Sequence, residues 1–466
     1  MIALTVAEIA RIIDAEIVDL DPNAIITEYP EIDSRKIMEG TFFVALPGER
    51  VDGNTYANEA ITNGARFAIT TVNLGIPSLV VEDTAEALIK LATFVRERMK
   101  HCTFIGITGS HGKTTTKDLL GHILSVRGEC VIPRESFNNE IGVPLTILHT
   151  TDTTQFCVLE MGARHVGNIS KLCLIAKPHI GVVLVVGSAH LGEFGSTAAI
   201  ARAKAELIEA LPEHGVAILG AYDSFTPHMG EGSARKRVTF GETSTCDVRA
   251  ADLEFREGRA HFDLVSESGR APVALRLLGA HQVANALAAA ATAIELGISI
   301  DSVAAALSTA EPRSKWRMEL HDVNDLLIIN DSYNANPESM QAALRTLVLL
   351  TQERGGVSWA ILGKMHELGE SEREEHLRIG RLASELGVDH LVSVGTVLYL
   401  EGLELDPSEG DEMLTHYFLT QEEVLSAMLH VEKGDVLLVK ASRAEHLDEL
   451  SEKLLASWQF EPVEQE

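Results

Sequence analysis

Cysteine is scarce in this chain. Only five of the 466 residues are cysteines, an odd number, and no two of them stand in C-x-x-C spacing. A disulfide framework requires paired cysteines, and cysteine-type zinc sites favour that spacing. The sequence therefore supports neither, and we expect the cysteines to be small buried apolar residues. They are Cys102, Cys130, Cys157, Cys173 and Cys246.

Basic residues are also few. The chain has 39 Lys and Arg against 68 Asp and Glu, which gives a formal net charge of −29. Nucleic-acid backbones and acidic membrane surfaces require a basic face on the protein that binds them. We therefore expect neither as a partner, and a negatively charged substrate would have to be held by basic groups close to it.

Long apolar runs are missing. Runs such as Val182–Gly187 are far too short to span a bilayer. The N-terminus lacks a basic segment, and charged residues interrupt its apolar positions, so it does not resemble a signal peptide. Thr5 and Glu8 instead have the spacing of a capping box that opens a short helix. We expect a cytoplasmic chain without membrane insertion.

The length predicts about three domains. We place them at residues 1–98, 99–312 and 313–466, each of α/β class. In the second segment, apolar strands alternate with helical stretches, which predicts a mostly parallel sheet with helices on both faces. The expected strands are 103–108, 156–160, 180–186 and 216–219, with helices after Lys113, at 200–211 and at 281–296.

The third segment begins a new α/β cycle near Arg313. The expected strands are 326–329, 357–362, 390–394 and 435–439, and Pro337 stands where a helix would begin. This segment contains no phosphate loop and no G-x-G-x-x-G, so dinucleotide binding is not indicated. In the first segment, 42–46 is the expected buried strand.

A glycine-rich loop after the strand at 103–108 is the most informative motif. Glycines let backbone N–H groups approach a phosphate, and the following helix adds its positive N-terminal end. Lys113 would reach the β and γ phosphates, and the Thr114 hydroxyl would bind Mg²⁺. The spacing is a variant of the standard phosphate loop, because Ile107 stands where the first glycine belongs. The expected nucleotide-binding residues are Gly109, Ser110, His111, Gly112, Lys113, Thr114 and Thr115.

Neighbouring strand ends carry further candidates, because ligands of parallel sheets bind at the carboxyl ends of strands. Glu160 ends an apolar strand and is a candidate Mg²⁺ ligand beside the phosphate loop. His190 follows the strand at 180–186 and is a candidate ligand of a second metal. Lys204 lies on a helix, and its pattern alone indicates a lysine that faces solvent.

Two polar stretches follow strands of the third segment. Residues 330–337 offer an Asp for ribose hydroxyls and Asn amides for a purine edge, and 440–443 offer cations and a hydroxyl for a carboxylate. The motifs described so far do not distinguish between kinases, ATPases, GTPases and ligases. They argue against a non-enzymatic scaffold, because a scaffold would tolerate loss of the candidate metal ligands and all of them are present.

Taken together, the motifs resemble those of the Mur ligase family, which forms amide bonds with ATP in peptidoglycan synthesis. The resemblance covers nearly the whole chain. It rests on T-G-S-H-G-K-T-T-T (108–116), R-M-E (317–319), N-N-E-I-G-V-P-L-T (138–146), D-S-Y-N-A-N-P (331–337), M-H-E-L-G (365–369), K-A-S-R (440–443) and D-S-R (33–35). The stretches at 138–146 and 331–337 are similar to the branch that adds D-alanyl-D-alanine to a UDP-muramoyl-tripeptide. The D-N-P-R signature of the diaminopimelate-adding branch is absent.

The resemblance implies a small N-terminal uridine-binding domain, a central phosphate-loop ATPase domain and a C-terminal Rossmann-like domain. It implies ATP, two Mg²⁺ ions and a lysine carbamylated by CO₂ at Lys204, in a protein that we expect to be a monomer. Lys113, Glu160, His190 and Lys204 would be catalytic. Thr114, Glu160, His190 and the modified Lys204 would be the metal ligands.

The same resemblance assigns binding roles. The residues expected at ATP outside the phosphate loop are Asn285, Arg317, Asp331, Asn334 and Asn336. Those expected at the other substrates are Ser34, Arg35, Asn138, Asn139, Lys440, Ser442 and Arg443. The chain departs from the family pattern at Ser136, Gln282, Lys364 and Ala441, none of which is an expected metal or phosphate ligand. The alternatives are a related ligase that adds a single amino acid, a folyl-polyglutamate synthetase, against which D-S-R argues, and a phosphate-loop NTPase or phosphotransferase.

Overall fold

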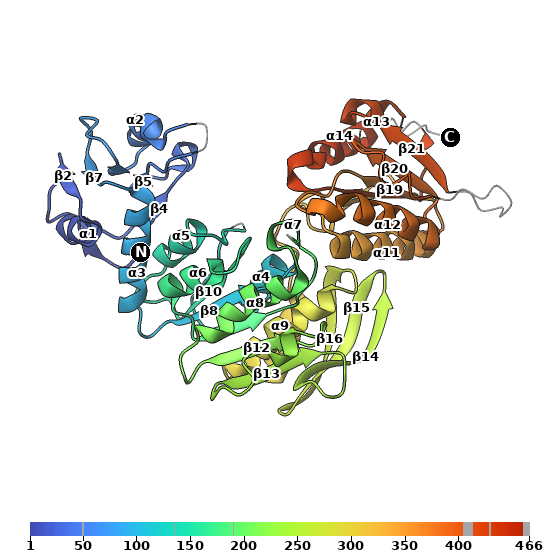
Figure 1. Ribbon diagram of the computed structural model, residues 1–466, viewed down its shortest axis with the longest axis horizontal. Coiled ribbons are helices and arrows are strands. Elements are labelled where there is room, and N and C mark those ends of the chain that lie inside the picture. The colour runs from blue at the N-terminus through green and yellow to red at the C-terminus, as the bar shows by residue number, and fades with distance from the viewer. Residues whose placement is uncertain (49–50, 135, 190, 404–412, 428–429, 460–466) are drawn as a thin grey trace.

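Three domains follow one another along the chain, each with one large β-sheet, and β1 and β3 form a further two-stranded sheet in the first domain (Figure 1). The computed structural model describes residues 1–48, 51–134, 136–189, 191–403, 413–427 and 430–459. In Figure 1 the N-terminal domain is blue, the middle domain runs from cyan-green to yellow below it, and the C-terminal domain is orange to red. The predicted fold class, three α/β domains with a mostly parallel middle sheet, is confirmed.

The N-terminal domain is built on a five-stranded sheet in the order β2-β7-β6-β5-β4. The predicted capping box opens α1: Glu8 N–H donates to Thr5 Oγ1 at 3.2 Å, and Thr5 N–H donates to Glu8 Oε2 at 2.8 Å. The predicted strand at 42–46 is β5, which is fully buried. Helix α3 leads from this domain into the next (Figure 1). The elements are β1 Leu4–Thr5, α1 Val6–Ile13, β2 Glu16–Val18, β3 Ile25–Ile26, β4 Pro30–Glu31, β5 Phe42–Val44, α2 Ala57–Thr62, β6 Ala68–Thr70, β7 Ser78–Val80 and α3 Thr84–Arg98.

The middle domain holds a nine-stranded sheet in the order β16-β15-β14-β13-β12-β11-β8-β10-β9. Strands β9 to β13 are parallel to their neighbours, as predicted. The strands are β8 Thr103–Thr108, β9 Cys130–Val131, β10 Phe156–Glu160, β11 Ile180–Val183, β12 Val216–Gly220 and β13 Lys236–Gly241. The helices are α4 Lys113–Ser125, α5 Gly142–Leu148, α6 Asn168–Ala176, α7 Leu191–Phe194, α8 Thr197–Glu209, α9 Gln282–Glu295 and α10 Ile300–Thr309.

An antiparallel extension of this sheet was not predicted. Strand β14 (Val248–Arg256) pairs with β13 in parallel, and β15 (Arg259–Ser266) and β16 (Gly269–Leu278) follow it as two consecutive antiparallel hairpins. Buried and exposed residues alternate along β15 and β16, because α10 covers one face and water the other. The alternation of strand and helix expected throughout residues 99–312 is therefore interrupted here.

The carboxyl ends of three adjacent strands meet at one edge of the sheet. Strand β8 pairs with β11 on one side and with β10 on the other. Strand β11 ends at Val183 rather than at residue 186, and the next residues bind the end of β8 and the loop that follows it. Leu184 N–H donates to Thr108 O at 3.0 Å, and Ser110 N–H donates to Val185 O at 2.9 Å. This edge therefore gathers the phosphate loop, Glu160 and the loop after β11.

The C-terminal domain has a six-stranded sheet in the order β17-β18-β22-β19-β20-β21, parallel except for β17. Helix α11 begins at Pro337, as predicted, with Asn336 as its N-cap. The strands are β17 Glu319–Val323, β18 Leu326–Asn330, β19 Ser358–Leu362, β20 His390–Val394, β21 Leu414–Phe418 and β22 Val436–Lys440. The helices are α11 Pro337–Arg354, α12 Glu372–Glu385, α13 Gln421–Ala427 and α14 Leu447–Gln459.

The middle and C-terminal domains touch through backbone as well as side chains. Gly192 in α7 lies against Gly369, and a Cβ atom at Gly192 would stand 2.6 Å from Gly369 N. Arg164 Nη2 donates to Glu367 Oε1 across the same boundary at 3.2 Å. Among the described residues, no helix combines the length and apolar composition needed to cross a membrane.

Candidate active site

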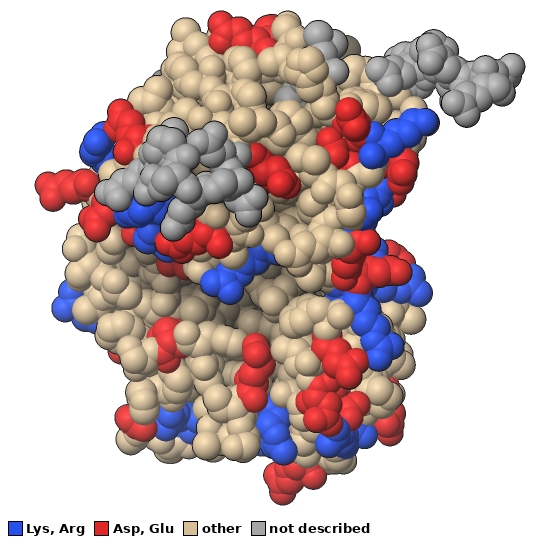
Figure 2. Space-filling model, turned by 90° about the vertical axis from the view of Figure 1, so that its right-hand side faces the viewer, with Lys and Arg blue, Asp and Glu red and all other residues tan. Residues whose placement is uncertain are grey.

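A cavity of about 840 Å³ lies between the middle and C-terminal domains. Figure 2 shows the right-hand side of the view in Figure 1, where a hollow lies between the upper and lower parts of the molecule with basic side chains beside it. Most of the residues expected from the sequence line it: Gly109, Ser110, His111, Gly112, Lys113, Thr114, Thr115, Asn138, Asn139, Glu160, Lys204, Asn285, Arg317, Asp331, Asn334, Asn336, Lys440, Ser442 and Arg443.

Two expected residues that the structure describes are not brought together with this set. Ser34 and Arg35 lie in the N-terminal domain and do not line the cavity. Ser34 Oγ donates to Glu59 Oε2 at 3.2 Å, and Arg35 Nε donates to Asp33 Oδ1 at 2.8 Å. His190 lies outside the described residues.

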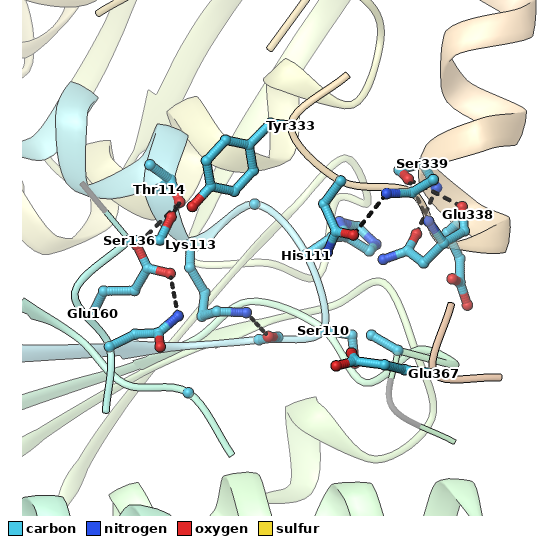
Figure 3. A pocket seen from close by; sticks show the side chains of 18 of the residues that line it. Ser110, His111, Lys113, Thr114, Ser136, Glu160, Tyr333, Glu338, Ser339 and Glu367 are labelled. Atoms are coloured by element: carbon cyan, nitrogen blue, oxygen red, sulfur yellow. Dashed lines mark hydrogen bonds between the residues drawn. The ribbon is translucent and has the colours of Figure 1, made fainter. Parts of the chain in front are cut away.

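The phosphate loop turns tightly between β8 and α4. Gly112 has φ +83 at the N-cap of α4, a conformation that favours glycine, and a Cβ atom at Gly109 would stand 2.8 Å from Leu184 Cβ. Lys113 Nζ donates to Gly109 O at 2.7 Å, so the ammonium lies across the loop (Figure 3). Burial holds the pKa of Lys113 below its ordinary value, and the nearby Glu160 carboxylate opposes that shift.

Thr114 and Glu160 form an oxygen-rich cluster beside the lysine (Figure 3). Thr114 Oγ1 donates to Glu160 Oε2 at 3.0 Å, and Asn138 Nδ2 donates to Glu160 Oε1 at 3.1 Å. Glu160 is 1% exposed. Hydroxyl and carboxylate oxygens are the ligands that Mg²⁺ prefers. In the described part of the chain, no group of three or more His, Cys, Asp or Glu side chains is arranged so that it could hold a metal ion. A magnesium ion here would therefore need further oxygens from a bound nucleotide.

Lys204 is buried, so the solvent-facing position indicated by its helical pattern is wrong. Only 5% of the residue is exposed, because α8 packs against β11 and α6. Burial is the main reason that its pKa lies well below the ordinary value, and Lys113 adds to this while Asp223 opposes it. A buried lysine with a lowered pKa is more often neutral, and a neutral amine can react with CO₂.

The C-terminal domain places an arginine beside the same threonine. Arg317 Nη2 donates to Thr114 Oγ1 at 3.0 Å and to Ser136 Oγ at 3.3 Å, and its guanidinium lies 3.9 Å from the ring centroid of Tyr333. Tyr333 stands within the 331–337 motif, but its residue type and position there predicted no role in the site. Stacking fixes the plane of the guanidinium and thereby directs its donors into the cavity.

Asp331 and Lys440 pair with each other in the cavity wall. Lys440 Nζ donates to Asp331 Oδ2 at 2.5 Å and to Asn334 O at 2.9 Å. The cation that was expected to hold a substrate carboxylate is thus already partnered. Asn336 is also engaged, because its Oδ1 accepts from Ser339 N–H at 2.8 Å.

The other cations and hydroxyls of this loop lie nearby. Arg443 lies 4.2 Å from the Trp316 ring centroid and pairs with Asp448 at 2.5 Å. Ser442 Oγ accepts from His366 N–H at 2.9 Å. In the middle domain, Asn285 Nδ2 donates to Gln282 Oε1 at 2.8 Å.

Comparison with known proteins gives matches along the chain. Residues 107–293 match the Mur ligase middle domain, 316–443 match the Mur ligase glutamate ligase domain, and 31–94 match the Mur ligase family catalytic domain. The UDP-N-acetylmuramoyl-tripeptide--D-alanyl-D-alanine ligase of Mycobacterium tuberculosis is 41% identical over 98% of both chains. The enzyme of the same name from Escherichia coli is 33% identical over 85% of this chain and 86% of the relative.

Solved structures agree with these matches. MurF from Acinetobacter baumannii superposes with a TM-score of 0.85 and 34% identity, covering 97% of this chain and 99% of the other. MurF from Thermotoga maritima, solved in complex with ADP, has a TM-score of 0.77 and 30% identity over 93% and 99% of the two chains. On the motifs, the three-domain fold, the composition of the cavity and these similarities, the chain belongs to the Mur ligase family.

Proposed function

We propose that this protein is an ATP-dependent ligase that joins D-alanyl-D-alanine to UDP-N-acetylmuramoyl-tripeptide in peptidoglycan precursor synthesis. The observation that carries the proposal is the shared cavity, in which a phosphate loop from one domain faces polar groups from another. The reaction of the named relatives requires ATP, an acid and an amine to meet in one place, and this cavity is bounded by both domains.

In the first step, a carboxylate oxygen of the tripeptide attacks the γ-phosphorus of ATP, and ADP leaves with the electron pair of the broken P–O bond. Lys113 and Arg317 supply positive charge where negative charge spreads over the transferred oxygens. Backbone N–H groups of the phosphate loop orient the nucleotide at the N-terminal end of α4. The product of this step is an acyl phosphate.

In the second step, the dipeptide amine attacks the acyl carbon, and phosphate leaves as the amide forms and the amine loses a proton. Water would hydrolyse the acyl phosphate, so the site must be closed while the intermediate exists. The direct contacts between the middle and C-terminal domains support such closure. Ser442 and Arg443 are the proposed contacts for the dipeptide, while Asn138 and Asn139 would face the muramoyl part.

Thr114 and Glu160 are the proposed ligands of one Mg²⁺ ion, and His190 is proposed for a second together with carbamylated Lys204. Bound metal would neutralise charge on the phosphates. The buried, lowered-pKa state of Lys204 supports the carbamate, which turns a cation into a metal-binding anion. Ser34 and Arg35 are the proposed contacts for uridine diphosphate, outside the cavity.

The enzyme is proposed to act as a monomer. ATP and UDP-linked sugars are cytoplasmic metabolites, so the proposal places the enzyme in the cytoplasm.

The adenosine contacts proposed from the C-terminal domain are Asp331, Asn334 and Asn336, with Asn285 from the middle domain.

The proposal is tested by incubating the purified chain with ATP, Mg²⁺, UDP-muramoyl-tripeptide and D-alanyl-D-alanine, and measuring the pentapeptide product by mass spectrometry. Product that requires every component supports the proposal. If the protein releases phosphate but forms an amide only when a single amino acid replaces the dipeptide, it belongs to another branch of the family.

A further inference from the structure

The Glu338 carboxylate of the C-terminal domain binds the middle domain through both of its oxygens. Glu338 lies in the first turn of α11, and Ser188 lies in the loop after β11. Ser188 N–H donates to Glu338 Oε1 at 2.7 Å, and Ser188 Oγ donates to Glu338 Oε2 at 2.9 Å. Both carboxylate oxygens therefore accept from a single residue across the domain boundary. Figure 3 shows Glu338 at the start of α11, on the same side of the cavity as His111 of the phosphate loop.

The loop that Glu338 holds is also bonded to the phosphate loop. Gly187 N–H donates to Ser110 Oγ at 2.8 Å, and Ser110 N–H donates to Val185 O at 2.9 Å. The residue between them is anchored separately, because Val186 N–H donates to Asp223 Oδ2 at 2.9 Å. Residues 185–188 are thus fixed in succession by the phosphate loop, by Asp223 and by Glu338.

The fit at this point is close. A Cβ atom at Gly187 would stand 3.0 Å from Glu338 Oε1, so the carboxylate lies directly against the backbone. Two hydrogen bonds from one residue to one carboxylate fix both the position and the orientation of that residue. Displacements of about 1 Å in a catalytic loop can cost a large factor in rate. This close contact with two hydrogen bonds can therefore transmit the position of α11 to the phosphate loop.

We propose that Glu338 is a positioning residue which holds residues 185–188 against Ser110, so that phosphoryl transfer requires the C-terminal domain to be docked. This inference rests on the proposed function. It assigns Glu338 no contact with substrate and no proton transfer. Its contribution is the pair of hydrogen bonds to Ser188, rather than its charge.

Steady-state kinetics of the full chain test the proposal with Glu338→Ala, Glu338→Gln and Ser188→Ala. We expect Glu338→Ala to lower kcat by about tenfold or more, because both hydrogen bonds to Ser188 are lost. The KM for UDP-muramoyl-tripeptide should stay within about twofold, because that substrate is bound elsewhere in the cavity. Glu338→Gln should retain most of kcat, since its Oε1 can accept from Ser188 N–H and its Nε2 can donate to Ser188 Oγ.

A partial reaction isolates the affected step. With ¹⁸O in the β,γ bridge of ATP and no dipeptide present, positional isotope exchange reports phosphoryl transfer to the tripeptide. The exchange should slow in Glu338→Ala by the same factor as kcat. Glu401→Gln is the matched control, because Glu401 belongs to the same domain and pairs with Arg373 at its surface, away from the cavity.

The wild-type protein, measured in the same assay, distinguishes failure of the proposed function from failure of the positioning role of Glu338. If it forms no pentapeptide, the proposed function fails; if it does and Glu338→Ala matches it, the positioning role fails. The role also fails if folded Glu338→Gln loses as much kcat as Glu338→Ala, because charge would then be the cause. Should Glu338→Ala not fold, Ser188→Ala decides: it removes one of the two bonds, and an unchanged kcat would refute the role.

Discussion

Thr114 Oγ1 donates a hydrogen bond to Glu160 Oε2 at 3.0 Å, which joins the first turn of α4 to the last residue of β10. The hydroxyl also accepts from Arg317 of the C-terminal domain. Residues of two domains therefore hold the proposed metal ligands in contact. Each of the hydrogen-bonded residues, Glu160, Thr114 and Arg317, can be substituted singly.

Glu160→Gln keeps the shape of the side chain and removes its charge. We expect kcat to fall by about 10²–10³-fold, because the carboxylate is proposed to hold Mg²⁺ at the phosphates. Pentapeptide formation at saturating ATP measures this. Glu295→Gln is the control, because Glu295 pairs with Lys236 on the surface. A Glu160→Gln enzyme with wild-type kcat at every Mg²⁺ concentration would exclude the carboxylate from the metal site.

Lys204→Ala removes the buried amine that is proposed to become a carbamate. Activity should fall by about 10²-fold or more, because the proposed metal ligand is lost. Short-chain acids such as acetate should restore part of it by supplying a carboxylate in the space left behind. Lys171→Ala, which alters an exposed lysine on α6, should show neither effect. Full activity of Lys204→Ala without added acid would rule out the carbamate.

Asp331→Asn leaves Lys440 without its partner in a buried position. The Asp331 and Lys440 side chains are 13% and 2% exposed, so an ammonium that keeps its bond to Asn334 O but lacks a counter-charge should cost about 3–5 kcal/mol of stability. All three tryptophans, Trp316, Trp359 and Trp458, lie in the C-terminal domain, so their fluorescence in urea reports its unfolding.

A second pair provides the comparison. Glu401→Gln breaks an exposed ion pair with Arg373 and should cost no more than about 1 kcal/mol. Replacing both Asp331 and Lys440 with apolar residues should recover stability but not activity. Equal urea midpoints for Asp331→Asn and Glu401→Gln would show that the buried pair has no special weight.

Acid should destabilise the C-terminal domain through His376. This side chain is fully buried, and its burial lowers its pKa below the ordinary 6.5. Its Nε2 accepts from Met365 N–H at 3.0 Å, so a proton there would face another N–H. Below pH 6.5 the unfolded chain binds the proton more readily, and the free energy of unfolding therefore falls as the pH is lowered toward the folded pKa.

The measurement is the thermal midpoint by tryptophan fluorescence from pH 7 to pH 5. His376→Gln should flatten the slope, whereas His228→Gln, which alters an exposed histidine of the middle domain, should leave it as in the wild type. Some slope should remain in His376→Gln, because burial also lowers the pKa of other histidines, such as His281 to about 4. A slope that is the same in all three proteins would exclude His376 as the cause.

Features fixed by neighbouring residues could be predicted from the sequence. The strand at 103–108, the loop after it and the helix start at Pro337 each depend on local glycine, proline and apolar patterns. In the strands at 248–278, apolar and polar residues also alternate, a pattern typical of antiparallel strands. These strands were not predicted, because a regular alternation of strand and helix was expected throughout this segment.

Features that depend on distant residues could not be predicted in this way. Lys204 is flanked by alanines and charged residues, so its pattern indicates an exposed position, and only the packing of α8 on β11 buries it. Asp331 and Lys440 stand far apart in the sequence and pair because β18 and β22 are neighbours. The placement of Glu338 against Ser188 depends likewise on how two domains meet.

Gly192 and Gly369 meet with no room for a single extra carbon atom. A methyl group introduced as Gly192→Ala would act as a wedge between the domains, without altering any side chain that lines the cavity. Such a variant would separate the binding of individual substrates, which each domain could still support, from the chemistry that needs them together. Because Gly192 and Gly369 both lack a side chain, the middle and C-terminal domains can approach each other closely enough to form one catalytic centre.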